Sequence, residues 1–183
     1  MARVADLLNP GPSGARIGFI QYGADVTNEF FLNTYEREQD ITDRIRRLTQ
    51  LGGRTNTERA LVALRREQFV ASRGDRPEVK NVALVLTDGQ SNYEDRDDVI
   101  DAAREANNAG IITRSVGVTA TAYTEIEEVA YIASPPHQQG QDYFLSTTFE
   151  GLLELVDTVV TNICEIGTPG TLGPVITTTP SPD

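Results

Sequence analysis

The sequence VALVL, Val82–Leu86, runs directly into TDGQS, Thr87–Ser91, and these ten residues decide the fold. The first five are apolar at every position, which is the pattern of a strand that is buried on both faces of a sheet. The pair Asp88-Gly89 then ends the strand in a turn. We therefore expect this strand at the centre of a parallel sheet.

Four further strands are predicted on either side of this segment. Arg16–Tyr22 and Val26–Leu32 are separated by the turn-like sequence Gly23-Ala24-Asp25, so they are expected to form an antiparallel hairpin at one side of the sheet. Ile111–Val118 and Tyr143–Leu145 supply two strands on the C-terminal side.

The intervals between the predicted strands carry apolar residues at helical spacing. This alternation predicts an α/β fold, with a mainly parallel sheet that is covered by helices and has one antiparallel edge strand. The apolar stripes are Ile41, Ile45 and Leu48, then Ala60, Ala63 and Leu64, and finally Phe149, Leu152, Val156, Val159, Val160 and Ile163.

Composition limits the class of protein and of partner. The chain has 183 residues, 39% hydrophobic and 23% charged, which is in the range of one compact domain. Its net charge of −11 disfavours nucleic acid and anionic membrane surfaces as partners, since both are polyanions. It has neither an apolar run long enough to insert in a membrane nor a secretory signal at its first residues.

The composition changes abruptly after residue 166. Residues 167–183 are rich in Thr, Pro and Gly and cannot supply a packed core, so we interpret residues 1–166 as the domain and 167–183 as a linker or tail. Segments of this composition are common as O-glycosylated spacers between extracellular modules, and equally as plain disordered tails.

Four motifs in this order resemble the von Willebrand factor type A domains of extracellular matrix proteins such as matrilins and fibril-associated collagens. The resemblance covers nearly the whole chain to Ile166. Each motif alone is weak evidence for the family, and the resemblance rests on the order of the four motifs and on the intervals between them. They are Arg16–Tyr22, Glu29–Tyr35, Gly52–Thr57 and Leu86–Ser91.

The resemblance implies a doubly wound, Rossmann-like α/β fold, with a metal-ion-dependent adhesion site above the carboxyl ends of the central strands. In this chain Thr55 would supply a hydroxyl and Asp88 a carboxylate, and such hard oxygen ligands suit Mg²⁺. An acidic residue of the partner completes the coordination in the family. The domain is accordingly expected to be a non-enzymatic adhesion module that binds collagen or another matrix protein outside the cell.

The chain departs from the family pattern at its N-terminus. The Asp-x-Ser-x-Ser ligand loop of the family is absent, and Met1–Leu8 match the end of the family's first helix. We therefore expect the chain to start inside a domain and the sheet to lack the family's first, central strand. Backbone groups of the flanking strands would then lack partners, so we expect the chain alone to fold poorly and to bind Mg²⁺ weakly or not at all.

Several candidate residues have simpler structural interpretations. Thr55 with Glu58 forms a possible capping box for the following helix, and Asp88-Gly89 is a common turn. His137, in a proline-rich stretch, is expected to be a loop residue rather than a ligand or base. Cys164 is either a small buried apolar residue or, as the resemblance implies, one half of a disulfide with a cysteine that precedes the missing first strand.

Three alternatives to extracellular adhesion remain. Type A domains also occur in intracellular scaffolds, and a degenerate domain could bind partners without metal. An enzyme of Rossmann type could use Gly52–Thr57 to hold a phosphate at a helix N-terminus. The last alternative is disfavoured, since the sequence lacks Gly-x-Gly-x-x-Gly, Gly-Lys-Ser/Thr, a nucleophile elbow and any histidine-centred cluster.

Overall fold

The structure is a computed structural model, and it describes residues 1–11, 13–49, 51, 54–88, 91, 96–118 and 123–166. The predicted linker, 167–183, lies outside the described residues. Helices and strands alternate as the sequence predicts. The strands are β1 Phe19–Tyr22, β2 Val26–Phe30, β3 Asn81–Thr87, β4 Ile111–Val118 and β5 Tyr143–Ser146. The α-helices are α1 Ala2–Leu7, α2 Glu38–Arg46, α3 Thr57–Ala63, α4 Arg96–Asn108, α5 Tyr123–Ile132 and α6 Phe149–Ile166, with a π-helical turn at Leu64–Gln68 and a 3₁₀ turn at Ala71–Arg73.

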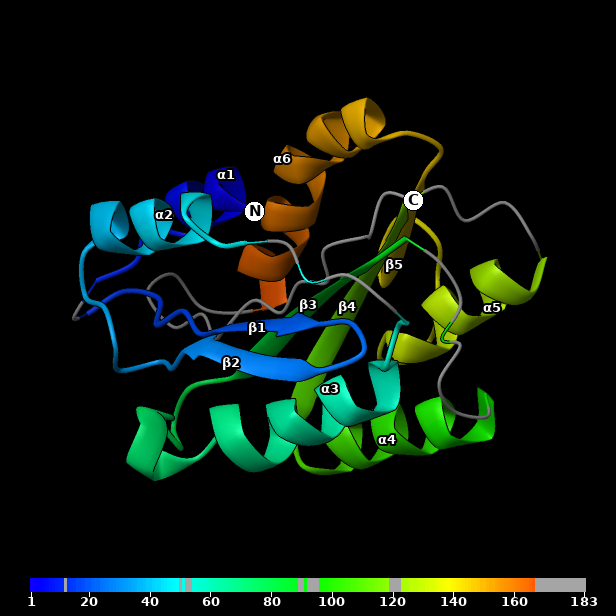
Figure 1. Ribbon diagram of the computed structural model, residues 1–183, viewed down its shortest axis with the longest axis horizontal. Helices are drawn as coiled ribbons and strands as arrows, with labels where there is room; N and C mark the ends of the chain where they lie inside the picture. The colour runs from blue at the N-terminus through cyan, green and yellow to red at the C-terminus, as the bar shows by residue number, and fades with distance from the viewer. Residues whose placement is uncertain are drawn as a thin grey trace.

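The strands pair as expected for a doubly wound sheet (Figure 1). β3 and β4 are parallel and in register from Asn81↔Ile111 to Thr87↔Gly117, and β4 is parallel to β5. β1 and β2 form the antiparallel hairpin. The predicted fold class is thus confirmed, although β1 and β2 are shorter than the apolar runs that predicted them.

Helices cover both faces of the sheet, with α3 and α4 on one side and α1, α2 and α6 on the other (Figure 1). β3 serves both layers because its successive side chains point to opposite faces. Leu84 and Leu86 pack in the cluster under α1 and α6, and Ala83 and Val85 pack in the cluster under α3 and α4. This two-sided burial explains why the segment is apolar at every position.

The sheet is divided between β1 and β3. Among the described residues, β1 is paired with β2 alone and β3 with β4 alone. This is the place of the central strand that the sequence analysis expected to be missing. The buried hydroxyl of Tyr22 on β1 donates a hydrogen bond to the Leu86 carbonyl on β3 across the division, at 3.4 Å. A side chain therefore satisfies one of the backbone groups that a neighbouring strand would otherwise pair.

Packing beside this division is incomplete on the α1 side. A small apolar cavity of about 50 Å³ is lined by Leu84 and Leu86 of β3 together with Met1 and residues of α1 and α6. The side chains of β3 on this face are therefore not fully covered by the helices.

In the part of the chain that the structure describes, no helix combines the length and the apolar character needed to cross a lipid bilayer.

We predict that hydrogen exchange in low urea separates the strands by their pairing. Amides of β4, which has a partner on each edge, are expected to exchange last, and amides of β1 earlier. A single cooperative transition with equal protection of β1 and β4, and with a urea m-value typical of a complete domain of this size, would contradict this prediction.

Candidate functional site

Three chain segments meet at the carboxyl ends of β1 and β3. Asp88 follows β3 directly, and Thr55 lies two residues before α3. The backbone N–H of Asn56 donates to the carbonyl of Gly23, just after β1, at 3.1 Å. The hydroxyl of Ser91 donates to the Thr55 carbonyl at 3.0 Å, which joins the segment after β3 to the segment before α3. The structure therefore brings both candidate metal ligands to one edge of the sheet.

Asp88 is a half-buried carboxylate at this edge. Burial raises its pKa, although a backbone hydrogen bond of the same residue opposes the shift. Loss of hydration disfavours the charged form of the group, and a nearby cation would favour that form. The local environment is thus one in which a bound cation would stabilise the carboxylate.

Thr55 does not occupy the N-cap position of the following helix. The N-cap of α3 is Asn56, whose side-chain oxygen accepts a hydrogen bond from the backbone N–H of Arg59 at 3.1 Å. The capping-box interpretation of Thr55 with Glu58 is therefore wrong, since α3 begins one residue later than that interpretation requires. The cap role belongs to a neighbour, which leaves the ligand role of Thr55 compatible with the local fold.

Two further residues of the site were missed as functional candidates. Ser91, 6% exposed, donates its backbone N–H to Oε1 of Glu128 on α5 at 2.8 Å. Glu128 is only 1% exposed. A glutamate beside Val129 in the buried face of a helix breaks the apolar pattern, which is the one sequence signal that could have indicated it.

His137 lies in the loop between α5 and β5, in agreement with its interpretation as a loop residue. It follows the Pro135-Pro136 pair, has a positive φ of 64°, and its Nδ1 is 2.9 Å from the carbonyl of Ala130. Its ring contacts Tyr131 edge-on, with ring centroids 5.6 Å apart.

Cys164 is exposed on α6, so the interpretation as a buried apolar residue is wrong. Partial burial of its thiol nevertheless raises its pKa. It is the one cysteine of the sequence, and the predicted disulfide to a cysteine outside this chain stays a prediction.

The donor set agrees in chemistry with a hard cation but is small. Thr55 offers a hydroxyl and Asp88 a carboxylate, both oxygen ligands of the kind that Mg²⁺ prefers. Within the described ranges no three His, Cys, Asp or Glu side chains are grouped so that they could hold a metal ion. Affinity for a hard ion rises with the number and charge of its ligands, so these residues alone support weak binding at most.

Comparisons with known proteins agree on one family. Residues 1–158 match the von Willebrand factor type A domain. Human matrilin-1 is 30% identical over 164 residues, which cover 90% of this chain and 31% of matrilin-1. The collagen alpha-1(XII) chain of Notophthalmus viridescens is 29% identical over 187 residues, which cover 100% of this chain and 19% of the collagen. The chain thus spans less than a third of the length of these relatives.

Solved structures give the same result. Proximal thread matrix protein 1 from the mussel byssus, in the form described as having a zinc-occupied MIDAS motif, superposes with a TM-score of 0.75. It is 26% identical, and the match covers 90% of this chain and 39% of the mussel protein. The chain therefore shares its overall fold with a solved protein.

We predict that Asp88→Asn raises the urea midpoint at pH 7 in EDTA. The folded state raises the pKa of Asp88, so the charged form lowers stability above the pKa of the unfolded chain. The penalty disappears as pH falls through the folded pKa, and the difference between the two proteins should disappear with it. An equal or lower urea midpoint of the variant at pH 7 would show that the charged Asp88 carboxylate does not lower the stability of the folded chain.

The helix cap gives a second test. Asn56→Ala should lower the free energy of unfolding by about 1 kcal/mol, since it removes the acceptor for the Arg59 N–H. Thr55→Ala is the matched control and should lower it by less. If urea titrations show a larger loss in the free energy of unfolding for Thr55→Ala than for Asn56→Ala, then Thr55 is the capping residue.

Proposed function

Because the chain belongs to the von Willebrand factor type A domain family, we propose that it is a non-enzymatic module for protein binding and adhesion in the extracellular matrix. The observation that carries the proposal is the half-buried Asp88 carboxylate after β3, joined through Ser91 to the segment of Thr55. Ligands of open α/β sheets bind outside the carboxyl ends of the strands, and this is that edge.

Thr55 and Asp88 are the residues that would hold a divalent cation, for which we propose Mg²⁺. A bound Mg²⁺ keeps open coordination positions that a carboxylate of a partner can fill. The zinc reported in the mussel relative supports a divalent ion at this edge of the fold. Two donors from this chain imply weak binding, so affinity for a partner would depend strongly on cation concentration.

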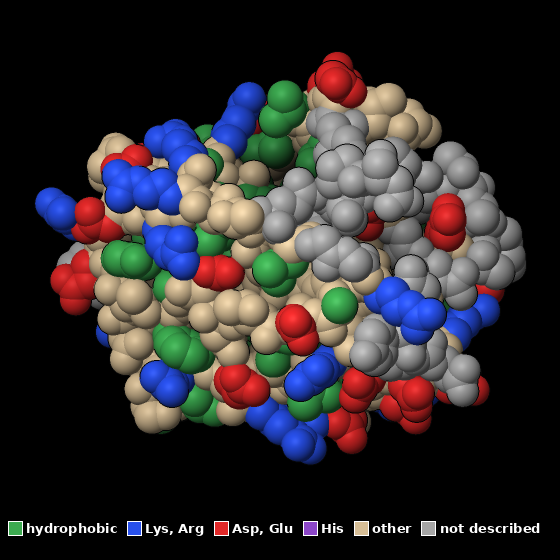
Figure 2. All heavy atoms as spheres, viewed as in Figure 1, with side chains coloured by type: hydrophobic (Ala, Val, Ile, Leu, Met, Phe, Trp, Pro, Cys, Tyr) green, Lys and Arg blue, Asp and Glu red, His purple; other side chains and the backbone are tan. Residues whose placement is uncertain are grey.

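The proposed partner is an extracellular matrix protein such as collagen, bound through an acidic residue. The net charge of −11 and the acidic side chains that gather over α4 in Figure 2 would repel an acidic partner unless a cation lay between them. Matrilin and collagen relatives support a place outside the cell. We propose the same location for this chain, with Cys164 in a disulfide.

A second candidate function is partner binding without metal. It is favoured by the small donor set within the described residues, where no cluster of three ligating side chains occurs. In that case the same edge would bind a partner through polar contacts alone, and removal of divalent cations would leave binding unchanged.

We predict that binding of the chain to immobilised fibrillar collagen requires Mg²⁺ and is abolished by EDTA. Asp88→Ala should reduce the binding at least about 10-fold, since removal of a charged ligand removes most of the affinity for the ion. Asp157→Ala is the matched control, because Asp157 is an exposed carboxylate of α6 paired with Arg3, and it should bind as the unchanged chain does.

Two results would decide against this mechanism. Collagen binding that persists in EDTA and in Asp88→Ala supports the metal-independent alternative. Binding of neither collagen nor any other matrix protein, with Mg²⁺ present and the chain folded, rejects matrix adhesion itself.

A further inference from the structure

We propose that Glu128 of α5 and Ser91 are positioning residues that hold Asp88 and Thr55 in one geometry for a cation. The inference rests on the proposed function and deepens it, since it assigns a role in the site to residues that supply no ligand. It is carried by two hydrogen bonds and by the burial of both side chains.

Ser91 connects the two ligand segments. It lies three residues after Asp88, and its hydroxyl donates to the carbonyl of Thr55 at 3.0 Å. A shift of Ser91 therefore moves the segment after β3 relative to the segment before α3. Cation affinity depends on the distance between the two ligand oxygens, so Ser91 is placed to influence it without touching the ion.

Glu128 fixes Ser91 from the other side. Its Oε1 accepts the Ser91 backbone N–H at 2.8 Å, and the residue is only 1% exposed. A hydrogen bond to a carboxylate is stronger than one between neutral groups, and burial restricts the motion of the side chain. Glu128 thus anchors the segment after β3 to α5.

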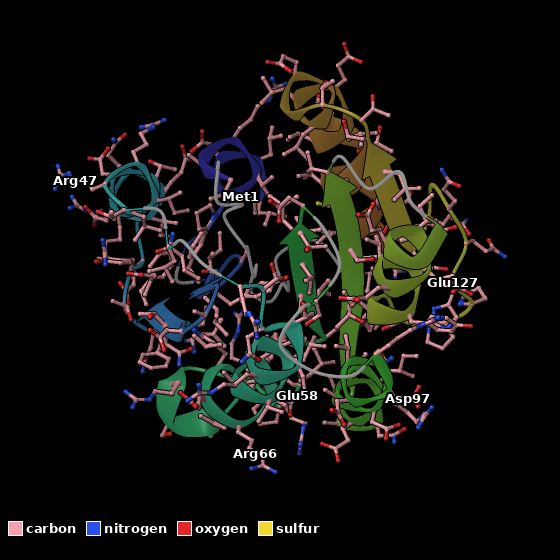
Figure 3. The ribbon with its side chains drawn as sticks, turned by 45° about the vertical axis from the view of Figure 1, so that its right-hand side comes forward. Met1, Arg47, Glu58, Arg66, Asp97 and Glu127 are labelled. Carbon is pink, nitrogen blue, oxygen red and sulfur yellow. The ribbon has the colours of Figure 1, made fainter. Side chains whose placement is uncertain are left out.

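Glu127, the residue before Glu128, anchors the start of α4 to α5. Glu127 forms an ion pair with Arg96, the first residue of α4, at 2.8 Å. Figure 3 shows Glu127 of α5 and Asp97 of α4 on the same side of the parallel strands. Consecutive residues of α5 therefore hold Ser91, within the connection between β3 and α4, and Arg96, at the start of α4.

Glu128 places a polar side chain where packing alone would favour an apolar one, since the residue is only 1% exposed. Taking a carboxyl group out of water is unfavourable unless donors compensate it, and the Ser91 N–H is such a donor. A role confined to packing would not require this hydrogen bond.

The test uses the full chain and Mn²⁺ as the probe, with free Mn²⁺ followed by electron paramagnetic resonance. Glu128→Ala removes the acceptor and should weaken Mn²⁺ binding by about 10-fold to 100-fold. Ser91→Ala keeps the N–H bond to Glu128 and loses the contact with Thr55, so it should weaken binding less, by about 10-fold at most. Ser72→Ala, an exposed serine of the 3₁₀ turn, is the matched control and should leave binding unchanged.

Glu128→Gln separates positioning from charge and from simple structural damage. It keeps an oxygen acceptor for the Ser91 N–H, so it should restore most of the Mn²⁺ affinity lost in Glu128→Ala. The urea midpoint of each variant shows whether it is folded. If Glu128→Ala does not fold, Ser91→Ala and Glu128→Gln decide the question.

The outcomes distinguish this inference from the proposed function. Mn²⁺ binding that Asp88→Ala abolishes but that both Ser91→Ala and Glu128→Ala leave within about twofold overturns the positioning role alone. Failure of the unchanged chain to bind Mn²⁺ rejects the cation site. In that event, shifts of the Thr55 and Asn56 amide resonances in Ser91→Ala would still support the hydrogen bond from the Ser91 hydroxyl to the Thr55 carbonyl. The absence of such shifts would reject that hydrogen bond as well.

Discussion

The parallel pairing of β3 with β4 is the constraint on which the rest of the structure depends. Its register, from Asn81↔Ile111 to Thr87↔Gly117, brings both strands to an end at the same edge. Asp88 stands at that edge because it is the next residue after β3. The helices that follow β3 and β4, α4 and α5, then return alongside each other, which allows consecutive glutamates of α5 to contact Ser91 and Arg96.

Much of this arrangement could be predicted from sequence because it is encoded locally. The apolar run of β3 requires burial on both faces, and the turn residues between β1 and β2 predict a hairpin. The positions of Thr55 and Asp88 followed from family motifs. Glu128 could not be predicted, since its partner Ser91 lies 37 residues away and meets it only through the packing of α5. The assignment of the cap to Asn56 rather than Thr55 depended on a boundary shift of one residue, which propensity does not resolve.

The division between β1 and β3 and the environment of Asp88 act in the same direction on stability. A small apolar cavity of about 50 Å³ lies beside α1 at the division, and burial of Asp88 disfavours the charged form that a cation requires. Both features lower the stability of the metal-free chain. A ligand that binds only the folded state at the carboxyl edge would restore part of the lost stability, since such binding shifts the folding equilibrium toward the native state.

The central claim is that the segments of Thr55, Asp88 and Ser91 form one cation site. The most direct measurement is the paramagnetic broadening of amide resonances by substoichiometric Mn²⁺ in the ¹⁵N-labelled chain. The account predicts broadening centred on the amides of these three residues, with those of α6 around Glu154 and Asp157 unaffected. Broadening centred on the acidic surfaces of α4 or α6, with the resonances of Thr55 and Asp88 unchanged, would contradict it.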